Sequence, residues 1–334
     1  MRVSIDGSPL DREELRRQGI GRYARGLLGE LPGVAHERGG EVVVLRRRAL
    51  RRPAVSLHHA LSLYGTPLLR RGPLVVTMHD VAPLQWPGEY LRTGLRHRAL
   101  YFAARRADAI LCPSAAARDD VVRHLDLDPD HVHVVPEGAD ESFRPTDARP
   151  PVDGPYLLYV GGMVERDARK DVEGLIDAFA DWSREQSRPE TLVLAGAGGP
   201  ASRELERRAA AAGARVAFPG FVADSELPAL YSGASCLVTA SRYEGFGLPV
   251  LEALACGTPV AAYEGAGAIP ETAGPGALLA PLGDGGALMG AAARICDEPE
   301  LRERLAAAGR RHAAAFTWRR TAEMTWSVYE SVAG

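Results

Sequence analysis

Two glutamates separated by seven residues are the strongest candidates for chemistry in this chain. They are Glu244 and Glu252, in the stretch YEGFGLPVLEALACGTP. Gly245 and Gly247 allow a tight turn after a predicted strand, and Pro249 stands where a helix would begin. Both carboxylates can then face one cleft, beside backbone N–H groups that suit a phosphate or an electron-rich sugar oxygen. The alternative is an ordinary strand-to-helix turn with two solvated glutamates.

A basic pair, Arg169–Lys170, contains the only lysine of a chain whose Lys+Arg total is 40. Such a bias is typical of GC-rich coding sequences, in which lysine codons change to arginine codons wherever either residue is acceptable. Lys170 therefore survives by chance, or it stands where a compact, mobile ammonium is needed instead of a planar guanidinium. The surrounding residues, DARKDVE, do not decide between these explanations.

Short apolar runs alternate with helical stretches along the chain, and these elements must position the candidate residues. The runs that predict strands are RVSID, EVVVL, LVVTMHD, DAILCPS, HVHVVPEG, YLLYVGG, TLVLAGAGG, RVAFPG, ASCLVTAS and PVAAYEG. Helices between apolar strands indicate parallel sheets covered on both faces. The sequence thus predicts an α/β protein with two facing Rossmann-like domains, whose interdomain cleft binds ligands at the carboxyl ends of the strands.

A proline-rich stretch marks the boundary between the two halves. Pro145–Pro155 holds four prolines and no apolar periodicity. We therefore expect domains at residues 1–146 and 156–316, joined by a linker at 147–155. The amphipathic stretch TWRRTAEMTWSVYESV predicts a further helix that covers a core.

Composition argues against a membrane-spanning, secreted or disulfide-rich protein. With 334 residues, 46% hydrophobic and 25% charged, the chain is expected to form soluble domains of ordinary globular type. No apolar run reaches about 18 residues, no signal peptide is visible, and four dispersed cysteines suit a reducing cytoplasm. Residues 1–150 carry a net charge of +4, and residues 151–334 carry −7. The basic excess, in Leu45–Pro53, Arg70–Arg71 and 91–106, is either a solvated surface or a contact for an anionic lipid.

Three weaker patterns are better explained by ordinary structure. GAGGPA, at residues 196–201, matches a dinucleotide-binding fingerprint, but no acidic residue ends the next strand to bind a ribose. The acidic series of DLDPDHVHVVPE, which ends at Glu137, resembles a calcium loop whose required glycine is replaced by His131. His131 and His133 share one face of a strand and are expected to be a surface pair. The sequence therefore predicts no metal site.

The glutamate-containing stretch also resembles a known enzyme family. The pattern E-G-F-G-L-P-x-x-E-A-x-A-x-G-x-P-V resembles the E-x7-E region of retaining glycosyltransferases with the GT-B fold, of the family 4 type. The resemblance covers nearly the whole chain. The other matching segments are RRQGIGRYARGLLGEL, VVTMHDVAPLQWP, VVPEGADESFRP, YVGGMVERDARKDVEGLIDAF, FPGFVADSELPALYSGAS and AIPETAGPGALLAPLGD. The nearest subgroup is the bacterial mannosyltransferase-like one, but Asp171 stands where asparagine is usual and Leu50–Leu74 is shortened.

The resemblance implies a role for each candidate residue in the second half. Glu244 would hydrogen-bond hydroxyls of the donor sugar, and Glu252 would accept from both ribose hydroxyls. Arg169 and Lys170 would hold the diphosphate, and Lys170 would follow the leaving phosphate as its negative charge builds. The loop expected to contact the sugar and phosphate consists of Gly245, Phe246, Gly247 and Leu248.

In the first half, the resemblance implies that Gly19 and Gly21 let a loop approach the diphosphate and that His79 lies near the sugar. It also implies that the helix at about 317–334 packs back onto this acceptor-side domain. The expected protein is a cytoplasmic, retaining, metal-independent hexosyltransferase that needs no cofactor and meets no nucleic acid. The basic first domain would contact the inner face of an anionic membrane peripherally.

The resemblance favours GDP-mannose as the donor, with UDP- and dTDP-sugars as alternatives. The acceptor would be a hydroxyl of a glycan, a lipid-linked molecule or a natural product. Two other functions remain open: a nucleotide-sugar epimerase or phosphorylase of the same fold, and a non-catalytic nucleotide-sugar-binding partner subunit. Donor hydrolysis without acceptor would separate an enzyme from a binding subunit, and release of free nucleotide would separate a transferase from an epimerase.

Overall fold

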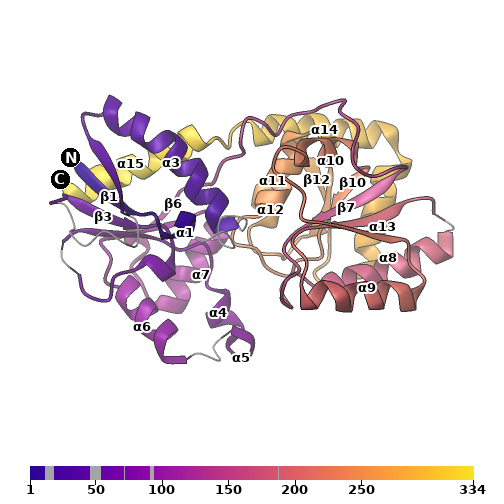
Figure 1. Cartoon of the computed structure of the whole chain (residues 1–334), viewed down its shortest axis with the longest axis horizontal. Coiled ribbons are helices and arrows are strands. Elements are labelled where there is room, and N and C mark those ends of the chain that lie inside the picture. Colours follow the sequence, from indigo (N-terminus) through magenta and orange to yellow (C-terminus); the bar gives the residue numbers. More distant parts are fainter. Residues whose placement is uncertain (12–18, 46–53, 71, 91–93, 187) are drawn as a thin grey trace. The chain divides into compact units, whose positions relative to one another are not determined.

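The computed structural model describes residues 1–334 apart from 12–18, 46–53, 71, 91–93 and 187. Residues 46–53, Arg71 and residues 91–93 of the predicted basic surface therefore lie outside the described residues. The chain forms two compact units: Met1–Gly138 together with Phe316–Gly334, and Ala139–Ala315. Each unit contains a six-stranded sheet in which every pair of neighbouring strands is parallel, with helices beside it (Figure 1). The prediction of two parallel α/β units is confirmed.

The sheet of the first unit has the strand order β2-β1-β3-β4-β5-β6. Its strands are β1 (Arg2–Asp6), β2 (Glu41–Leu45), β3 (Leu57–Ala60), β4 (Leu74–Thr77), β5 (Ala109–Cys112) and β6 (Val132–Val134). Its helices are α1 (Ser8–Asp11), α3 (Gly19–Glu37), η1 (Leu63–Gly65), α4 (Ala82–Gln85), α5 (Pro87–Tyr90), α6 (Gly94–Ala104), α7 (Ala115–Leu125), η3 (Pro129–His131) and α15 (Trp318–Ala333). The central strands are buried throughout, as expected for a parallel sheet with two covered faces.

Helix α15 belongs to the core of the first unit although it follows the second unit in sequence. It lies beside α3, and Trp326 and Tyr329 are almost completely buried with Leu27 and Leu31 of α3 (Figure 1). At its start, the Trp318 ring takes the space where a side chain at Gly26 would stand. The fit between α15 and α3 therefore depends on an aromatic ring opposite a glycine.

A chain of buried hydrogen bonds joins α15 to the middle of the first sheet. Tyr329 lies 2.5 Å from Nδ1 of His59, and Nε2 of His59 lies 2.8 Å from the hydroxyl of Thr77. Thr77 lies 2.9 Å from the hydroxyl of Tyr23 on α3. Burial lowers the pKa of His59 to about 3, so the imidazole is neutral and supplies one donor and one acceptor.

The sheet of the second unit has the strand order β12-β11-β10-β7-β8-β9. Its strands are β7 (Tyr156–Val160), β8 (Thr191–Ala195), β9 (Val216–Gly220), β10 (Cys236–Val238), β11 (Val260–Tyr263) and β12 (Ala277–Ala280). Its helices are α8 (Val172–Gln186), α9 (Pro200–Ala212), α10 (Leu227–Gly233), α11 (Leu248–Ala255), α12 (Ile269–Ala273), η4 (Gly274–Gly276), α13 (Gly285–Asp297) and α14 (Pro299–Ala313). The loops that follow β7 and β10, two neighbouring central strands, carry Arg169, Lys170 and residues 244–247, and α11 carries Leu248 and Glu252.

In the part of the chain that the structure describes, no helix is both long and apolar enough to cross a membrane.

Candidate functional site

The loop between β10 and α11 carries Glu244, and it is held by the start of α11 and by hydrogen bonds to α12 and the segment before it. Gly247 has a φ of +95°, a left-handed conformation that glycine adopts readily, and it precedes the first residue of α11. The backbone of Glu244 pairs with the segment before α12, where its oxygen accepts from the N–H of Ala268 at 2.9 Å. The carbonyl of Phe246 accepts from the hydroxyl of Thr272 at 2.6 Å. The side chains of Phe246 and Leu248 are buried, so this loop offers a ligand its backbone.

Lys170 and Glu244 form an ion pair. The ammonium of Lys170 lies 2.5 Å from Oε1 of Glu244, and the side chains are 24% and 16% exposed. The hydroxyl of Ser241 donates to the same carboxylate oxygen at 2.8 Å. The single lysine and the first glutamate of the pair, 74 residues apart in sequence, are therefore brought into direct contact.

Arg169 is held by a different carboxylate. Its Nε and Nη2 donate to Asp167 at 3.1 Å and 2.8 Å, and its side chain is 15% exposed. Its carbonyl accepts from the N–H of Arg242 at 2.6 Å, which joins the loop after β7 to the loop after β10. The guanidinium is thus fixed, whereas the neighbouring ammonium of Lys170 ends a flexible chain.

Asp171 stands where the mannosyltransferase-like subgroup usually has asparagine, and its surroundings accommodate aspartate. Its φ is +44°, in the left-handed region that asparagine and aspartate tolerate better than other residues with a side chain. One carboxylate oxygen accepts from the N–H of Gly174 at 3.3 Å, at the start of α8. The other accepts from Nε of Arg242 at 3.0 Å. Aspartate keeps the turn and the helix cap that asparagine can supply, and adds a charge for Arg242.

Glu252 lies on α11, inside the second unit. It is 3% exposed, and its Oε2 accepts from the hydroxyl of Tyr231 on α10 at 2.8 Å. Glu244 thus lies beside the ammonium of Lys170, and Glu252 lies beside the hydroxyl of Tyr231.

His79 follows β4 in the first unit, and each of its ring nitrogens has an acceptor within hydrogen-bond distance. Nδ1 lies 3.0 Å from the carboxylate of Glu137, and Nε2 lies 3.1 Å from the carbonyl of Leu61. Both neighbours are acceptors, so both bonds form when the imidazole is protonated twice. Burial is the largest influence and lowers the pKa of His79, but the hydrogen bond to Glu137, the charge of Glu137, the carbonyl of Leu61 and the charge of Asp80 together outweigh it, and the pKa lies above its ordinary value. Tyr23 packs edge-on against the ring, with centroids 4.7 Å apart.

Gly19 and Gly21 lie in the first turn of α3. Gly19 is exposed, and a side chain added there would meet no atom of the described residues within 4 Å. Gly21 is buried.

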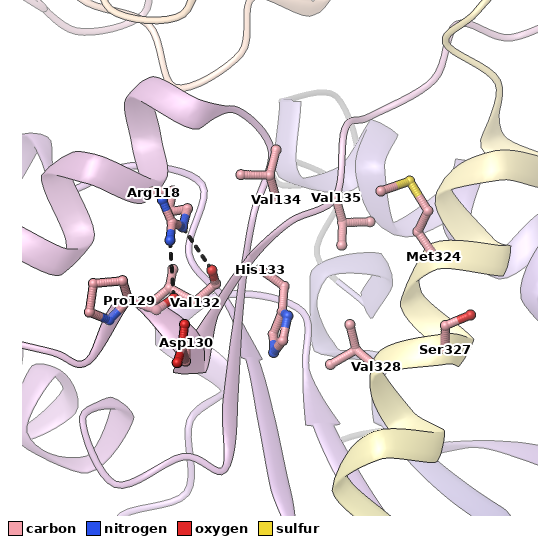
Figure 2. Close-up of a pocket in the computed structure, with 10 residues that line it drawn as sticks. All are labelled: Arg118, Pro129, Asp130, Val132, His133, Val134, Val135, Met324, Ser327 and Val328. Atoms are coloured by element: carbon pink, nitrogen blue, oxygen red, sulfur yellow. Dashed lines mark hydrogen bonds between the residues drawn. The ribbon is translucent and has the colours of Figure 1, made fainter.

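Two grooves lie within single units, and neither contains the predicted catalytic residues. One of about 640 Å³ lies between β6 and α15, where Figure 2 shows Val134, Val135, Met324 and Val328 around it. Arg118 at its edge is held by the carbonyls of Val132 and Pro129. The other, of about 570 Å³, is charged and includes Asp171 and Arg242 of the second unit.

Some partners of the candidate residues were missed by sequence reasoning. They are Glu137, Asp167, Tyr231, Ser241 and Arg242. Asp167 could have been noticed, because it stands two residues before Arg169 and can reach back to it. Within the described ranges, no three His, Cys, Asp or Glu side chains gather as a metal ion would need.

Two family models match this chain. Residues 142–312 match the one described as glycosyl transferases group 1, and residues 42–143 match glycosyltransferase family 4. The first match contains the Lys170–Glu244 pair and Glu252. The second contains His79 and Glu137.

Similar proteins include two mannosyltransferases. O-antigen chain mannosyltransferase B of Escherichia coli is 27% identical over 82% of this chain and 74% of its own length. The MMP alpha-(1->4)-mannosyltransferase of Mycolicibacterium hassiacum is 32% identical over 84% of this chain and 71% of its own length. The structure of Anabaena Alr3699/HepE in complex with UDP-glucose matches with a TM-score of 0.77 at 18% identity, covering 99% of this chain and 100% of that one. At that identity the match shows a shared fold.

Proposed function

Because the chain belongs to the glycosyl transferases of group 1, we propose that it moves a hexose from a nucleotide diphosphate sugar to an acceptor hydroxyl with retention of configuration. The family makes the chain a glycosyltransferase, and the predicted GT-B fold is confirmed. The observation that carries the finer proposal is the ion pair between Lys170 and Glu244. When the donor binds, each member of the pair can exchange the other for a group of the donor. A diphosphate can take the ammonium, and sugar hydroxyls can take the carboxylate.

We propose GDP-mannose as the donor, since both relatives named above are mannosyltransferases. UDP-glucose, which HepE binds, is the competing candidate. The proposal includes an acceptor that is a glycan, a lipid-linked molecule or a natural product, and a peripheral contact between the first unit and an anionic membrane.

In the proposed reaction, bond breaking and bond making take place on the same face of the sugar. The bond between the anomeric carbon and the diphosphate oxygen breaks, and the acceptor hydroxyl attacks that carbon from the face that the diphosphate leaves. The departing phosphate oxygen takes the proton of the acceptor hydroxyl, so no protein base is needed. Lys170 stabilises the charge that grows on the phosphate, while Arg169, fixed by Asp167, holds the diphosphate in place.

The transfer is expected to retain the anomeric configuration of the donor and to proceed without a metal ion. Proton NMR of the first-formed product should show the anomeric configuration of the donor, and EDTA should leave the rate unchanged, because Arg169, Lys170 and the N-terminus of α11 neutralise the diphosphate. An inverted product rejects the mechanism, and loss of activity with EDTA that magnesium restores rejects the metal-free site. Release of an epimerised donor without acceptor would indicate an epimerase.

Replacing Glu252 with alanine should weaken nucleotide binding. A carboxylate that accepts two ribose hydroxyls contributes roughly 1.5–3 kcal/mol, which is about 10- to 100-fold in Kd. Calorimetry with free GDP measures this effect, and GDP should bind the native protein more tightly than UDP or dTDP. Tyr231→Phe is the matched control, since it removes the hydroxyl that contacts Glu252 and keeps the carboxylate.

Because Glu252 is buried, a melting curve must show that the alanine variant is folded. Glu252→Gln provides a second variant with nearly the same shape. A folded variant with an unchanged Kd would remove Glu252 from the nucleotide site.

A further inference from the structure

The most exposed large hydrophobic side chains of the described residues gather in the first unit. Leu69 is 78% exposed, Phe102 64%, Leu68 58% and Tyr64 57%, whereas every other exposed large hydrophobic residue of the described chain is at most 50% exposed. They come from two short segments, residues 64–70 and α6 with the residues that follow it. Exposed apolar side chains that gather in this way mark an interaction site more often than single ones do.

Polar contacts hold these two segments side by side at both ends. At the start of α6, the hydroxyl of Tyr64 lies 3.3 Å from Nε2 of His97, and the rings meet edge to face at 5.7 Å. Beyond its end, Arg70 donates to both carboxylate oxygens of Asp108 at 2.5 Å and 2.6 Å and to the carbonyl of Arg106 at 2.7 Å. Residues 64–70 therefore run along α6, and the exposed side chains form one surface.

The same surface is basic. Arg98, Phe102 and Arg105 follow one another at spacings of four and three residues, so they share one side of the helix, while Leu100 and Tyr101 are buried. In residues 64–70 and 94–108, the arginines are Arg70, Arg96, Arg98, Arg105 and Arg106. Within these two segments the one acidic residue is Asp108, which is paired with Arg70; from outside them, Asp126 lies 3.9 Å from Arg105. We call residues 64–70 with the exposed side of 96–106 the arginine-aromatic face.

We propose that the arginine-aromatic face docks on the surface of an anionic lipid bilayer. The face combines two signals: arginines for lipid phosphates, and an aromatic ring with leucines for the boundary between headgroups and acyl chains. An acidic protein partner would match the arginines, but it would leave two leucines and a phenylalanine in need of an apolar counterpart. A bilayer satisfies both at once. This inference rests on the proposed peripheral membrane contact and assigns its residues.

One end of the face lies near the edge of the sheet where ligands bind. The carbonyl of Leu61, which accepts from His79, stands three residues before Tyr64. The face therefore begins near the carboxyl ends of β3 and β4, the edge of an open α/β sheet where ligands bind. It ends at the amino ends of β4 and β5, where Arg70 and the N–H of Leu74 meet Asp108. A bilayer on this face would thus reach the ligand-binding edge at its Tyr64 end.

Sedimentation with lipid vesicles tests the face. The full chain should bind vesicles that contain phosphatidylglycerol and should not bind vesicles of phosphatidylcholine alone. Raising sodium chloride to about 0.5 M should weaken the binding, because salt screens the arginines. The variant Leu69→Ser with Phe102→Ser, and the variant Arg98→Gln with Arg105→Gln, should each lower the partition coefficient at least about tenfold.

Matched controls separate this face from general surface effects. Phe221→Ser removes an exposed phenylalanine of the second unit, and Arg304→Gln with Arg311→Gln removes the same charge from α14. Both controls should bind vesicles like the native chain, and all variants should bind GDP with unchanged Kd. Native protein that binds GDP but not the vesicles overturns the face and leaves the transferase proposal intact. Equal binding by face and control variants, or a dimer that Phe102→Ser dissociates, also overturns it.

Discussion

Replacing Glu244 with alanine is expected to lower kcat about 100-fold while the Kd for free GDP changes less than about twofold. The carboxylate lies beside Lys170 and Ser241, and its proposed ligands are hydroxyls of the transferred sugar. Free GDP lacks that sugar, so its affinity does not report the loss. Hydrogen bonds to sugar hydroxyls strengthen as positive charge develops at the anomeric carbon, and their removal therefore appears in kcat.

The measurement is a steady-state assay of sugar transfer combined with calorimetry. Glu303→Ala is the matched control, because Glu303 is an exposed glutamate of the same unit, on α14. It should retain native kcat. Full activity of Glu244→Ala would remove this residue from the site, and equal losses of kcat and of GDP affinity would indicate that the loop itself had changed.

Replacing Lys170 with arginine is expected to lower kcat at least about tenfold, or ~1.4 kcal/mol, although the charge is kept. Lys170 lies 2.5 Å from Glu244, and it must exchange that carboxylate for the phosphate as the donor binds. A guanidinium in its place can hold Glu244 through two parallel hydrogen bonds, which resists the exchange. Arg169 is already fixed by Asp167 and cannot follow the leaving group instead. The effect should fall on kcat more than on KM.

The single lysine allows an independent check by chemical labelling. An amine-selective reagent can modify Lys170 and the N-terminal amine, and bound GDP should protect Lys170. Arg311→Lys introduces a remote, exposed lysine that should react whether or not GDP is bound. If Lys170→Arg is fully active and labelling ignores GDP, the lysine survives through codon drift and has no catalytic role.

The strands could be predicted where apolar, β-branched runs mark them, and they were missed where other residues form them. EVVVL and TLVLA are unmistakable, and both are strands. Strand β3 is LHHA, whose two histidines break the apolar run, and β12 is ALLA, built from residues that favour helices. His59 is tolerated in β3 because Thr77 and Tyr329 satisfy its ring nitrogens. Such distant partners cannot be read from a local pattern.

In the candidate site, too, the sequence predicted residues but not the contacts between them. The motif pointed to Lys170, Glu244 and His79 as candidates, but it did not indicate that Lys170 contacts Glu244 or that His79 contacts Glu137. Glu137 was considered in the sequence only within a calcium-like series and the segment VVPEGADESFRP, because its contact with His79 depends on where β6 joins the sheet. The φ of Asp171 is likewise a property of the folded turn. Pairings across 58 and 74 residues are set by the sheet topology, which composition and spacing do not fix.

The first unit consists of two pieces of the chain, Met1–Gly138 and Phe316–Gly334, so it cannot be completed until the whole chain has been synthesised. Trp326 and Tyr329, which complete its core, leave the ribosome only after the whole of Ala139–Ala315. Until then α3 lacks the helix that covers it, and His59 lacks the hydroxyl of Tyr329. The second unit is continuous and can fold while the first waits with apolar surface exposed. During translation, the half that is made first is therefore the half that is completed last.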